Sequence, residues 1–207
     1  MKTIFKTQLA LLLLLAVGLV SARFAPAGYK VGDTVQDFSL KNVDGKMISL
    51  ASNSQVKGYI ITFTCNTCPV AKLYEERIIA LDQKYASKGY PVLAIQPNDP
   101  GISPGDSYDL MQKRAKDKKY AFPYLVDETQ AIAQTFGATN TPHVFVVKKD
   151  GDKFKVAYIG AIDNNSQDAS QATKKYVEEA VDELLQGKAV TTPSAKAIGC
   201  GIKWKKA

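Results

Sequence analysis

Two cysteines three positions apart, Cys65 and Cys68, stand where an apolar strand pattern gives way to a helical one. The run Gly58–Phe63 is rich in β-branched and aromatic residues and has the length of a buried strand. From Val70 onward apolar residues recur at helical spacing, and Pro69 suits a first helical turn, where its missing N–H is no loss. Two thiols at such a junction suit reversible disulfide chemistry.

This arrangement predicts different roles for the two thiols. It places Cys65 just ahead of a helix N-terminus, where unpaired N–H groups and the helix dipole favour a thiolate. Cys65 is therefore the predicted attacking sulfur, and Cys68 the sulfur that resolves the mixed disulfide. The alternative is an inert bridge, but so tight a loop would constrain the unfolded chain very little.

Four segments resemble the thioredoxin-like superfamily, and in particular its redoxin (AhpC/TSA-like) group of thiol-disulfide oxidoreductases. The resemblance covers roughly residues 28–187 and rests on Val31–Leu40, Cys65–Pro69, Phe122–Thr129 and Thr141-Pro142. It implies an α/β fold with a central mixed β-sheet flanked by helices and an N-terminal β-hairpin as in peroxiredoxins. It also implies that Pro142 is cis and faces the cysteines, and that Thr141 binds the substrate chain through backbone hydrogen bonds.

The chain departs from the family pattern at two positions beside the cysteines. Thr64 stands where tryptophan is frequent, and Tyr59 stands where many relatives carry a buried acid that accepts a proton. Another acid or a water molecule must then take that proton. The candidates are Glu75, Glu76 and Asp99.

A peroxiredoxin-like thiol peroxidase is the alternative enzyme. Thr62 and Cys65 match the Thr-x-x-Cys pattern in which threonine and a distant arginine activate peroxide. However, Gly58 replaces the expected proline, and Thr141 stands where peroxiredoxins commonly have arginine. The only arginines after residue 22 are Arg23, Arg77 and Arg114.

A metal-binding or metal-delivery module is the non-enzyme alternative. Cys65, Cys68, Cys200 and the single histidine, His143, make up a zinc set by residue type, but their spacing matches no zinc motif. Covalent haem is excluded because Pro69 stands where CxxCH needs histidine. We therefore predict no metal and no cofactor, with His143 as a strand residue whose auxiliary role stays open.

The third cysteine lies in a glycine-flanked tail segment, Ile198–Trp204. Glycines allow close backbone approach. One hypothesis is that the tail folds back and places Cys200 near Cys65 and Cys68, as a third exchange partner or a lid. The other is a free tail thiol. Three cysteines cannot all pair within one chain, so at least one is free, intermittently paired or shared.

The first residues have the pattern of a secretory signal. Lys2 and Lys6 precede an apolar stretch of about 12 residues and a small-residue site at Val20–Ala22. We predict a signal peptide over 1–22, a thioredoxin-like domain over 23–187, and a C-terminal tail over 188–207 packing on or near it. The protein is then exported, periplasmic or secreted, with no stable membrane insertion after cleavage. An uncleaved anchor is the lesser alternative.

The charge pattern bears on partners. The chain has a net charge of +7, and the part after residue 22 has 25 basic and 20 acidic residues. Clustered lysines such as Lys113–Lys119 usually form solvated faces, so no nucleic-acid partner is expected. The expected partners are protein disulfide or dithiol substrates and an electron donor or acceptor protein.

The positions of turn-forming residues between apolar runs predict the remaining strands and helices. Strands are expected at 35–40, 47–50, 58–64, 92–95, 122–126, 143–147 and 155–159, the first two as a hairpin. Helices are expected at 70–88, 108–119 (capped by Asp106–Ser107), 129–136 and 170–186.

Overall fold

The structure, a computed structural model, describes residues 28–206. Its strands are β1 (Thr34–Val35), β2 (Ser39–Asn42), β3 (Met47–Ser49), β4 (Gly58–Phe63), β5 (Val92–Gln96), β6 (Tyr124–Val126), β7 (Asn140–Thr141), β8 (His143–Asp150), β9 (Lys153–Gly160) and β10 (Cys200–Gly201). Its helices are α2 (Pro69–Tyr85), α3 (Tyr108–Asp117), α4 (Ala131–Phe136) and α5 (Tyr176–Leu185). Short 3-10 helices are η1 (Leu50–Ser52), η2 (Ala86–Lys88), η3 (Pro104–Asp106) and η4 (Ala169–Gln171).

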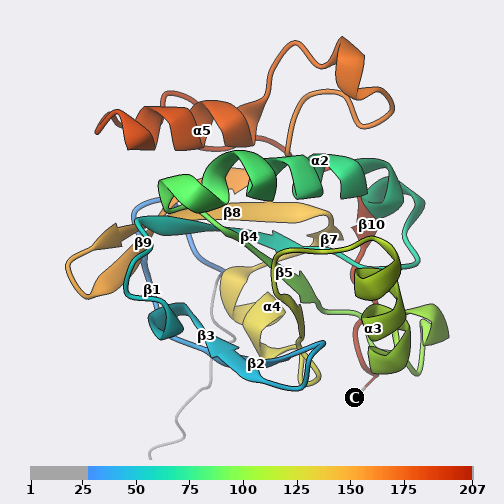
Figure 1. Cartoon of the computed structure of the whole chain (residues 1–207). Helices are drawn as coiled ribbons and strands as arrows, with labels where there is room; N and C mark the ends of the chain where they lie inside the picture. The colour runs from blue at the N-terminus through green and yellow to red at the C-terminus, as the bar shows by residue number, and fades with distance from the viewer. Residues whose placement is uncertain (1–27, 207) are drawn as a thin grey trace, which may run out of the picture.

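The main sheet is mixed and has eight strands in the order β1-β9-β8-β4-β5-β6-β2-β3. Strand β4 is central, parallel to β5 and antiparallel to β8. Helices α2 and α5 cover one face of the sheet, and α4 covers the other (Figure 1). This is the predicted thioredoxin-like architecture. Strands β2 and β3 form the predicted N-terminal hairpin, but its first strand begins at Ser39 rather than at Val35, because Val35 lies in β1 and pairs with β9.

Strand β4 is buried along its whole length because both faces of the sheet are covered. Its alternate side chains enter two different apolar cores: Ile60 packs beneath α2 and α5, whereas Ile61 and Phe63 pack on the α4 side. The continuous apolar run that identified the strand in the sequence follows from this double burial.

Two chain reversals at one end of β4 and β8 position the functional groups. Strand β4 ends at Phe63, and α2 begins at Pro69, so the CxxC loop lies between them. Phe63 pairs with His143, the first residue of β8, and the peptide bond just before β8, Thr141–Pro142, is cis. The register of β4 with β8 thus brings the cis-proline turn beside the cysteine loop.

The last helix begins at Tyr176, so the prediction of a helix from Ser170 was wrong. The segment before it is held in a different local structure by side-chain caps. Asp168 Oδ1 accepts a hydrogen bond from the backbone N–H of Ser170. Asn164 Oδ1 accepts hydrogen bonds from the backbone N–H groups of Thr173 and Lys174. These bonds compete with helix formation.

The predicted signal peptide, residues 1–22, lies outside the described residues. None of the helices within residues 28–206 is long and apolar enough to cross a bilayer.

Candidate functional site

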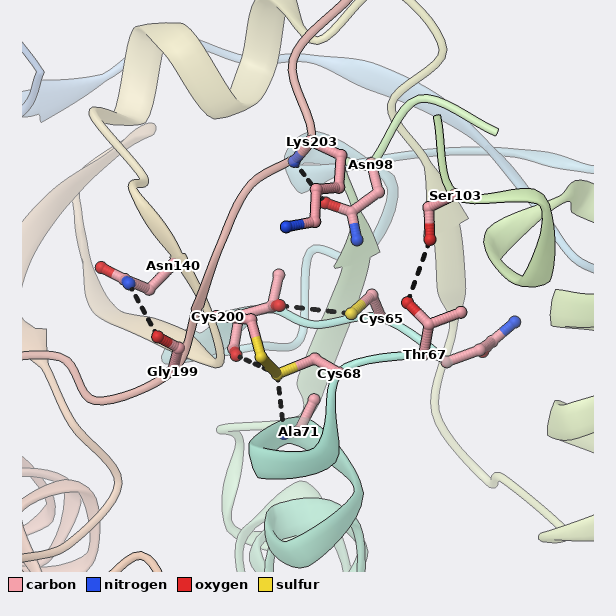
Figure 2. The surroundings of a disulfide bond; sticks show 12 residues. Cys65, Thr67, Cys68, Ala71, Asn98, Ser103, Asn140, Gly199, Cys200 and Lys203 are labelled. Carbon is pink, nitrogen blue, oxygen red and sulfur yellow. Dashed lines mark hydrogen bonds between the residues drawn. A yellow bond between two sulfur atoms is a disulfide. The ribbon is translucent and has the colours of Figure 1, made fainter. Parts of the chain in front are cut away.

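The three cysteines lie together at the N-terminal end of α2 (Figure 2). Cys68 and Cys200 form a disulfide across 132 positions of sequence, with Cα atoms 6.0 Å apart. Cys65 is a free thiol and is only 5% exposed. The structure thus brings the tail cysteine to the CxxC pair, and it leaves the predicted attacking sulfur reduced.

Thr141 touches both cysteines of the CxxC motif. Its side-chain Oγ1 lies 3.2 Å from Cys65 Sγ, close enough for a hydrogen bond in either direction. Its backbone oxygen lies 3.2 Å from Cys68 Sγ. That second contact carries no hydrogen bond in the disulfide, because a bonded sulfur has no proton, but a reduced Cys68 could donate there. The peptide bond between Thr141 and Pro142 is cis, as predicted.

The helix N-terminus acts on Cys68 rather than on Cys65. Cys68 is the N-cap of α2, and its Sγ accepts a hydrogen bond from the N–H of Ala71 at 3.4 Å. The sequence analysis assigned this stabilisation to Cys65, which lies three residues further from the helix. The first-turn N–H therefore points at the sulfur of Cys68, the resolving cysteine of the prediction, and favours negative charge on it.

A buried carboxylate holds the two residues between the cysteines. Asp106 is completely buried, and its Oδ1 accepts hydrogen bonds from the N–H groups of Asn66 at 2.7 Å and Thr67 at 3.1 Å. Its Oδ2 accepts from the hydroxyls of Thr67 and Ser103, both at 2.7 Å, and from Asn98 Nδ2 at 2.9 Å. Five donors on one buried carboxylate fix the CxxC loop in one conformation.

The tail runs across the mouth of the site as an added strand. Strand β10 pairs antiparallel with β7, with Cys200 opposite Thr141 and Gly201 opposite Asn140. Figure 2 shows this segment running beside the cysteines and continuing to Lys203, whose N–H donates to Asn98 Oδ1 at 2.9 Å. The tail therefore bridges the cis-proline turn and the loop that follows β5.

A small cavity of about 10 Å³ lies behind Cys65 and is also lined by Glu75. That volume corresponds to roughly one water-sized probe. Burial raises the pKa of Glu75, but hydrogen bonds from Tyr120, Lys118 and Arg114 outweigh burial, so its pKa is lowered overall. Of the acids named from the sequence, Glu75 shares a cavity with Cys65, Glu76 has a mostly exposed side chain, and Asp99 lies on the loop that binds the tail.

Tyr59 cannot take over the role of the missing acid. Its hydroxyl donates to the backbone oxygen of Leu50 at 2.9 Å, and the ring is buried. Burial, together with the charge of Asp37, raises the pKa of Tyr59 to about 12. The phenol is therefore protonated at neutral pH, on the side of the core away from α2.

His143 is also neutral in this site. The ring is 8% exposed, and burial lowers its pKa to about 4. Its Nδ1 accepts a hydrogen bond from the N–H of Thr139 at 3.3 Å, and it lies against the ring of Phe145. Within residues 28–206 no three His, Cys, Asp or Glu side chains are grouped as metal ligands would be.

A peroxidase would need Thr62 and an available arginine to activate peroxide at Cys65, and the structure does not provide such an arginine within residues 28–206. Thr62 is fully buried, and its Oγ1 has no hydrogen-bond partner. Arg77 pairs with Asp163 at 2.7 Å, and Arg114 pairs with Glu75 at 2.7 Å. Both arginines of the described part of the chain are thus engaged with carboxylates.

The sequence model of the AhpC/TSA family matches residues 31–158. The chain belongs to the AhpC/TSA family. This family match contains the CxxC motif and the cis-proline turn, whereas β10 and its cysteine lie beyond it.

Individual relatives agree with this assignment. The thiol-disulfide oxidoreductase ResA of Geobacillus thermodenitrificans is 25% identical over 75% of this chain and 86% of its own length. The crystal structure of an uncharacterized conserved protein from Geobacillus kaustophilus is 33% identical, with a TM-score of 0.80 over 87% of this chain and 95% of that one. The exposed lipoprotein thioredoxin of Streptococcus pneumoniae shares the fold at 22% identity, with a TM-score of 0.53 over 73% of this chain and 99% of that one.

Several site residues could not be identified from the sequence, among them Asn98 and Ser103, which bind Asp106. Asp106 was interpreted only as part of a helix cap, and Asn140 and Gln130 received no role. Asn140 Nδ2 donates to Gly199 O at 3.0 Å, and Gln130 Nε2 donates to Lys203 O at 2.9 Å. Gln130 has a left-handed backbone, with φ of 62°, which is uncommon for a residue other than glycine. No pattern in the sequence marks this position.

Proposed function

We propose that the protein is an exported thiol-disulfide oxidoreductase that exchanges disulfides with protein substrates through Cys65 and Cys68. The observation that carries the proposal is the position of Thr141, whose two oxygens each lie 3.2 Å from one of these sulfurs. A substrate strand paired with Thr141 would have its disulfide beside both cysteines. The activity named for the ResA relatives is the same exchange.

The reduction of a substrate disulfide follows from this geometry. The Cys65 thiolate attacks one substrate sulfur, the S–S bond breaks, and the other substrate sulfur leaves as a thiolate that takes a proton. Cys68 then attacks the Cys65 sulfur, which releases the second substrate thiolate and leaves a Cys65–Cys68 disulfide. Run in reverse, the same steps oxidise a substrate dithiol.

The tail cysteine supplies a third step. Cys200 attacks the Cys68 sulfur of the Cys65–Cys68 disulfide, which forms the Cys68–Cys200 bond and releases Cys65 as a thiolate. The arrangement observed here, with Cys65 free and Cys68 joined to Cys200, is the product of that step. A partner dithiol must then reduce the Cys68–Cys200 bond to complete a turnover.

Proton transfer and export complete the proposal. Glu75 lines the cavity that it shares with Cys65 and is the acid placed to take the thiol proton through one water molecule, although its lowered pKa makes it a weak base. A long-range disulfide suits an oxidising compartment, in agreement with the signal-like pattern of residues 1–22.

The test is the reduction of insulin disulfides with dithiothreitol as the electron source. We expect the wild type to accelerate the reaction and Cys65→Ser to lose at least about a hundredfold of that rate. Cys200→Ser keeps both CxxC thiols and loses only the third step, which dithiothreitol replaces by reducing the Cys65–Cys68 disulfide directly, so this variant should still accelerate the reaction. A Cys65→Ser protein with the full rate would rule the proposal out.

A thiol peroxidase is the second candidate. It is favoured by the side-chain hydroxyl of Thr62, which lies three residues before Cys65 and has no hydrogen-bond partner. The ion pairs of Arg77 and Arg114 weigh against it, since an activating arginine must be available to peroxide. Peroxide consumption with a thiol donor separates the two activities.

A further inference from the structure

The tail occupies the strand position where a substrate would pair with Thr141. Besides the two opposed pairs of β7 and β10, the N–H of Ile202 donates to Thr139 O at 3.1 Å. Asn140 Nδ2 binds the backbone oxygen of Gly199 on the other side of the cysteine. Backbone groups before and after Cys200 are therefore bound in extended form, as in strand addition.

The residue before the cysteine has no room for a side chain. A Cβ placed on Gly199 would lie 2.3 Å from the backbone oxygen of Thr141 and 2.9 Å from the nitrogen of Pro142. Both obstacles are backbone atoms of the cis-proline turn, so no change of side-chain rotamer relieves the clash. Pairing in this register therefore requires glycine immediately before the cysteine.

The residue after the cysteine is free of this restriction. A Cβ placed on Gly201 would meet no atom within 4 Å. The two glycines that flank Cys200 look equivalent in sequence, yet only the first faces the turn. This contrast provides a matched pair of substitutions.

The second residue after the cysteine is held by apolar contacts. Ile202 is 6% exposed and belongs to the core cluster on the α4 side of the sheet, with Phe136 and Ala138. An aliphatic side chain here leaves water on docking and stabilises the bound strand, whereas a polar one would not.

We propose that this groove selects extended substrate segments with glycine immediately before the reacting cysteine and an aliphatic residue two positions after it. The tail is the resident occupant that displays this pattern, and it must leave before a substrate can bind. This inference rests on the proposed function, because it names the substrate class of that exchange. Selectivity arises from the cis-proline backbone before the cysteine and from the apolar core after it.

The first test compares Gly199→Ala with Gly201→Ala in the oxidised full-length protein. The readout is the rate at which a bulky maleimide alkylates Cys65 beneath the tail. We expect Gly199→Ala to raise this rate about tenfold or more, because overpacking against backbone displaces the tail. Gly201→Ala should stay within about twofold of wild type. Equal rates in the two variants would overturn the proposal.

The second test uses peptides as substrates for full-length protein carrying Cys65→Ser and Cys200→Ser, in which Cys68, the residue that the tail cysteine bonds, traps the mixed disulfide. The probe is a peptide with the sequence of residues 198–203, its cysteine joined to thionitrobenzoate. The Cys68 thiolate attacks the peptide sulfur, the protein–peptide disulfide forms, and coloured thionitrobenzoate leaves as the anion. Three further peptides carry alanine before the cysteine, alanine after it, or serine in place of the aliphatic residue.

We expect alanine before the cysteine to slow release about tenfold, serine to slow it severalfold, and alanine after the cysteine to change it less than twofold. Equal rates for all four peptides would remove the selectivity, as would a failure of every peptide where the small symmetric disulfide of thionitrobenzoate still reacts. Insulin reduction that depends on Cys65 would then leave the proposed function standing. Insulin reduction that survives Cys65→Ser would instead remove the proposed function.

Discussion

Cys200 lies directly opposite Thr141 in an antiparallel strand pair, and its sulfur is bonded to Cys68, whose Sγ is 3.2 Å from the backbone oxygen of that same threonine. Cys200 thus occupies the place at which we propose that a substrate strand pairs with Thr141. Reduction of the Cys68–Cys200 disulfide therefore also opens the site, because that disulfide is the only covalent bond between the tail and the CxxC loop.

The cysteine states can be mapped directly. In oxidised protein unfolded without reductant, we expect Cys65 to be alkylated, and Cys68 and Cys200 to be recovered as one disulfide-linked peptide pair. Because Cys65 is 5% exposed, its alkylation in the folded protein should be much slower than after unfolding. Mass spectrometry of non-reduced digests checks this. Recovery of mainly Cys65–Cys68 disulfide would contradict the arrangement.

Loss of the tail disulfide should lower the stability of the folded protein. The bond closes a loop of 132 positions, and a loop of that size restricts the unfolded chain strongly. We expect Cys200→Ser to lower the free energy of unfolding of the oxidised protein by about 3 to 5 kcal/mol. Urea unfolding measures this, with Cys65→Ser as the control that keeps the bond. A loss below about 1 kcal/mol in Cys200→Ser would argue against a formed disulfide in solution.

Asp106 should contribute strongly to the stability of the folded protein. Replacing it with alanine leaves the N–H groups of Asn66 and Thr67 without their acceptor, in a site closed to water. We expect a loss of about 3 kcal/mol in the free energy of unfolding and a slower insulin reaction, because the CxxC loop is no longer fixed. Asp109→Ala, on the first turn of α3, is the control. Equal stability of the two variants would show that the five hydrogen bonds contribute little.

Acid should destabilise the protein through His143. Burial lowers the folded-state pKa of His143 to about 4, below its unfolded value of 6.5. The unfolded chain therefore binds a proton that the folded chain excludes, and the associated stability is complete above pH 6.5 and lost as pH falls towards 4. The contribution amounts to about 2 kcal/mol between pH 7 and pH 5.

The measurement is urea unfolding of wild type and His143→Gln at these two pH values. Carboxylates titrate in both proteins, so the difference between their pH dependences isolates the histidine. Parallel pH dependences would mean that the imidazole gains its proton equally well in the folded state.

Much of the fold could be predicted from local patterns, because those patterns report burial. The run that became β4 is apolar throughout since both its faces are covered, and Pro69 begins α2 as its position in the sequence indicated. The boundary that failed, the start of α5, depends on caps from Asn164 and Asp168 that reach across several residues. A helical periodicity does not reveal such competing turns.

The site was harder to predict because its decisive relationships are long-range. Any two of the three cysteines could have paired, and only the tail's register against Thr141 selects Cys68 and Cys200. Asp106 precedes a helix and was therefore interpreted as part of its cap, yet Ser107 is the N-cap and makes no side-chain cap bond. The carboxylate is turned towards Asn66 and Thr67, which lie 40 and 39 positions away in the sequence, respectively.

The pairing of β10 with β7 also has a consequence for the molecule's solubility. While the tail is in place, the backbone groups of Asn140 and Thr141 are satisfied by the same chain. Reduction that frees the tail exposes the unpaired edge of β7 and the apolar residues that Ile202 covers, such as Phe136 and Ala138. Such an edge pairs readily with other chains. Concentrated protein should therefore self-associate more under reducing conditions than under oxidising ones, so that the tail protects against aggregation as well as guarding the thiol.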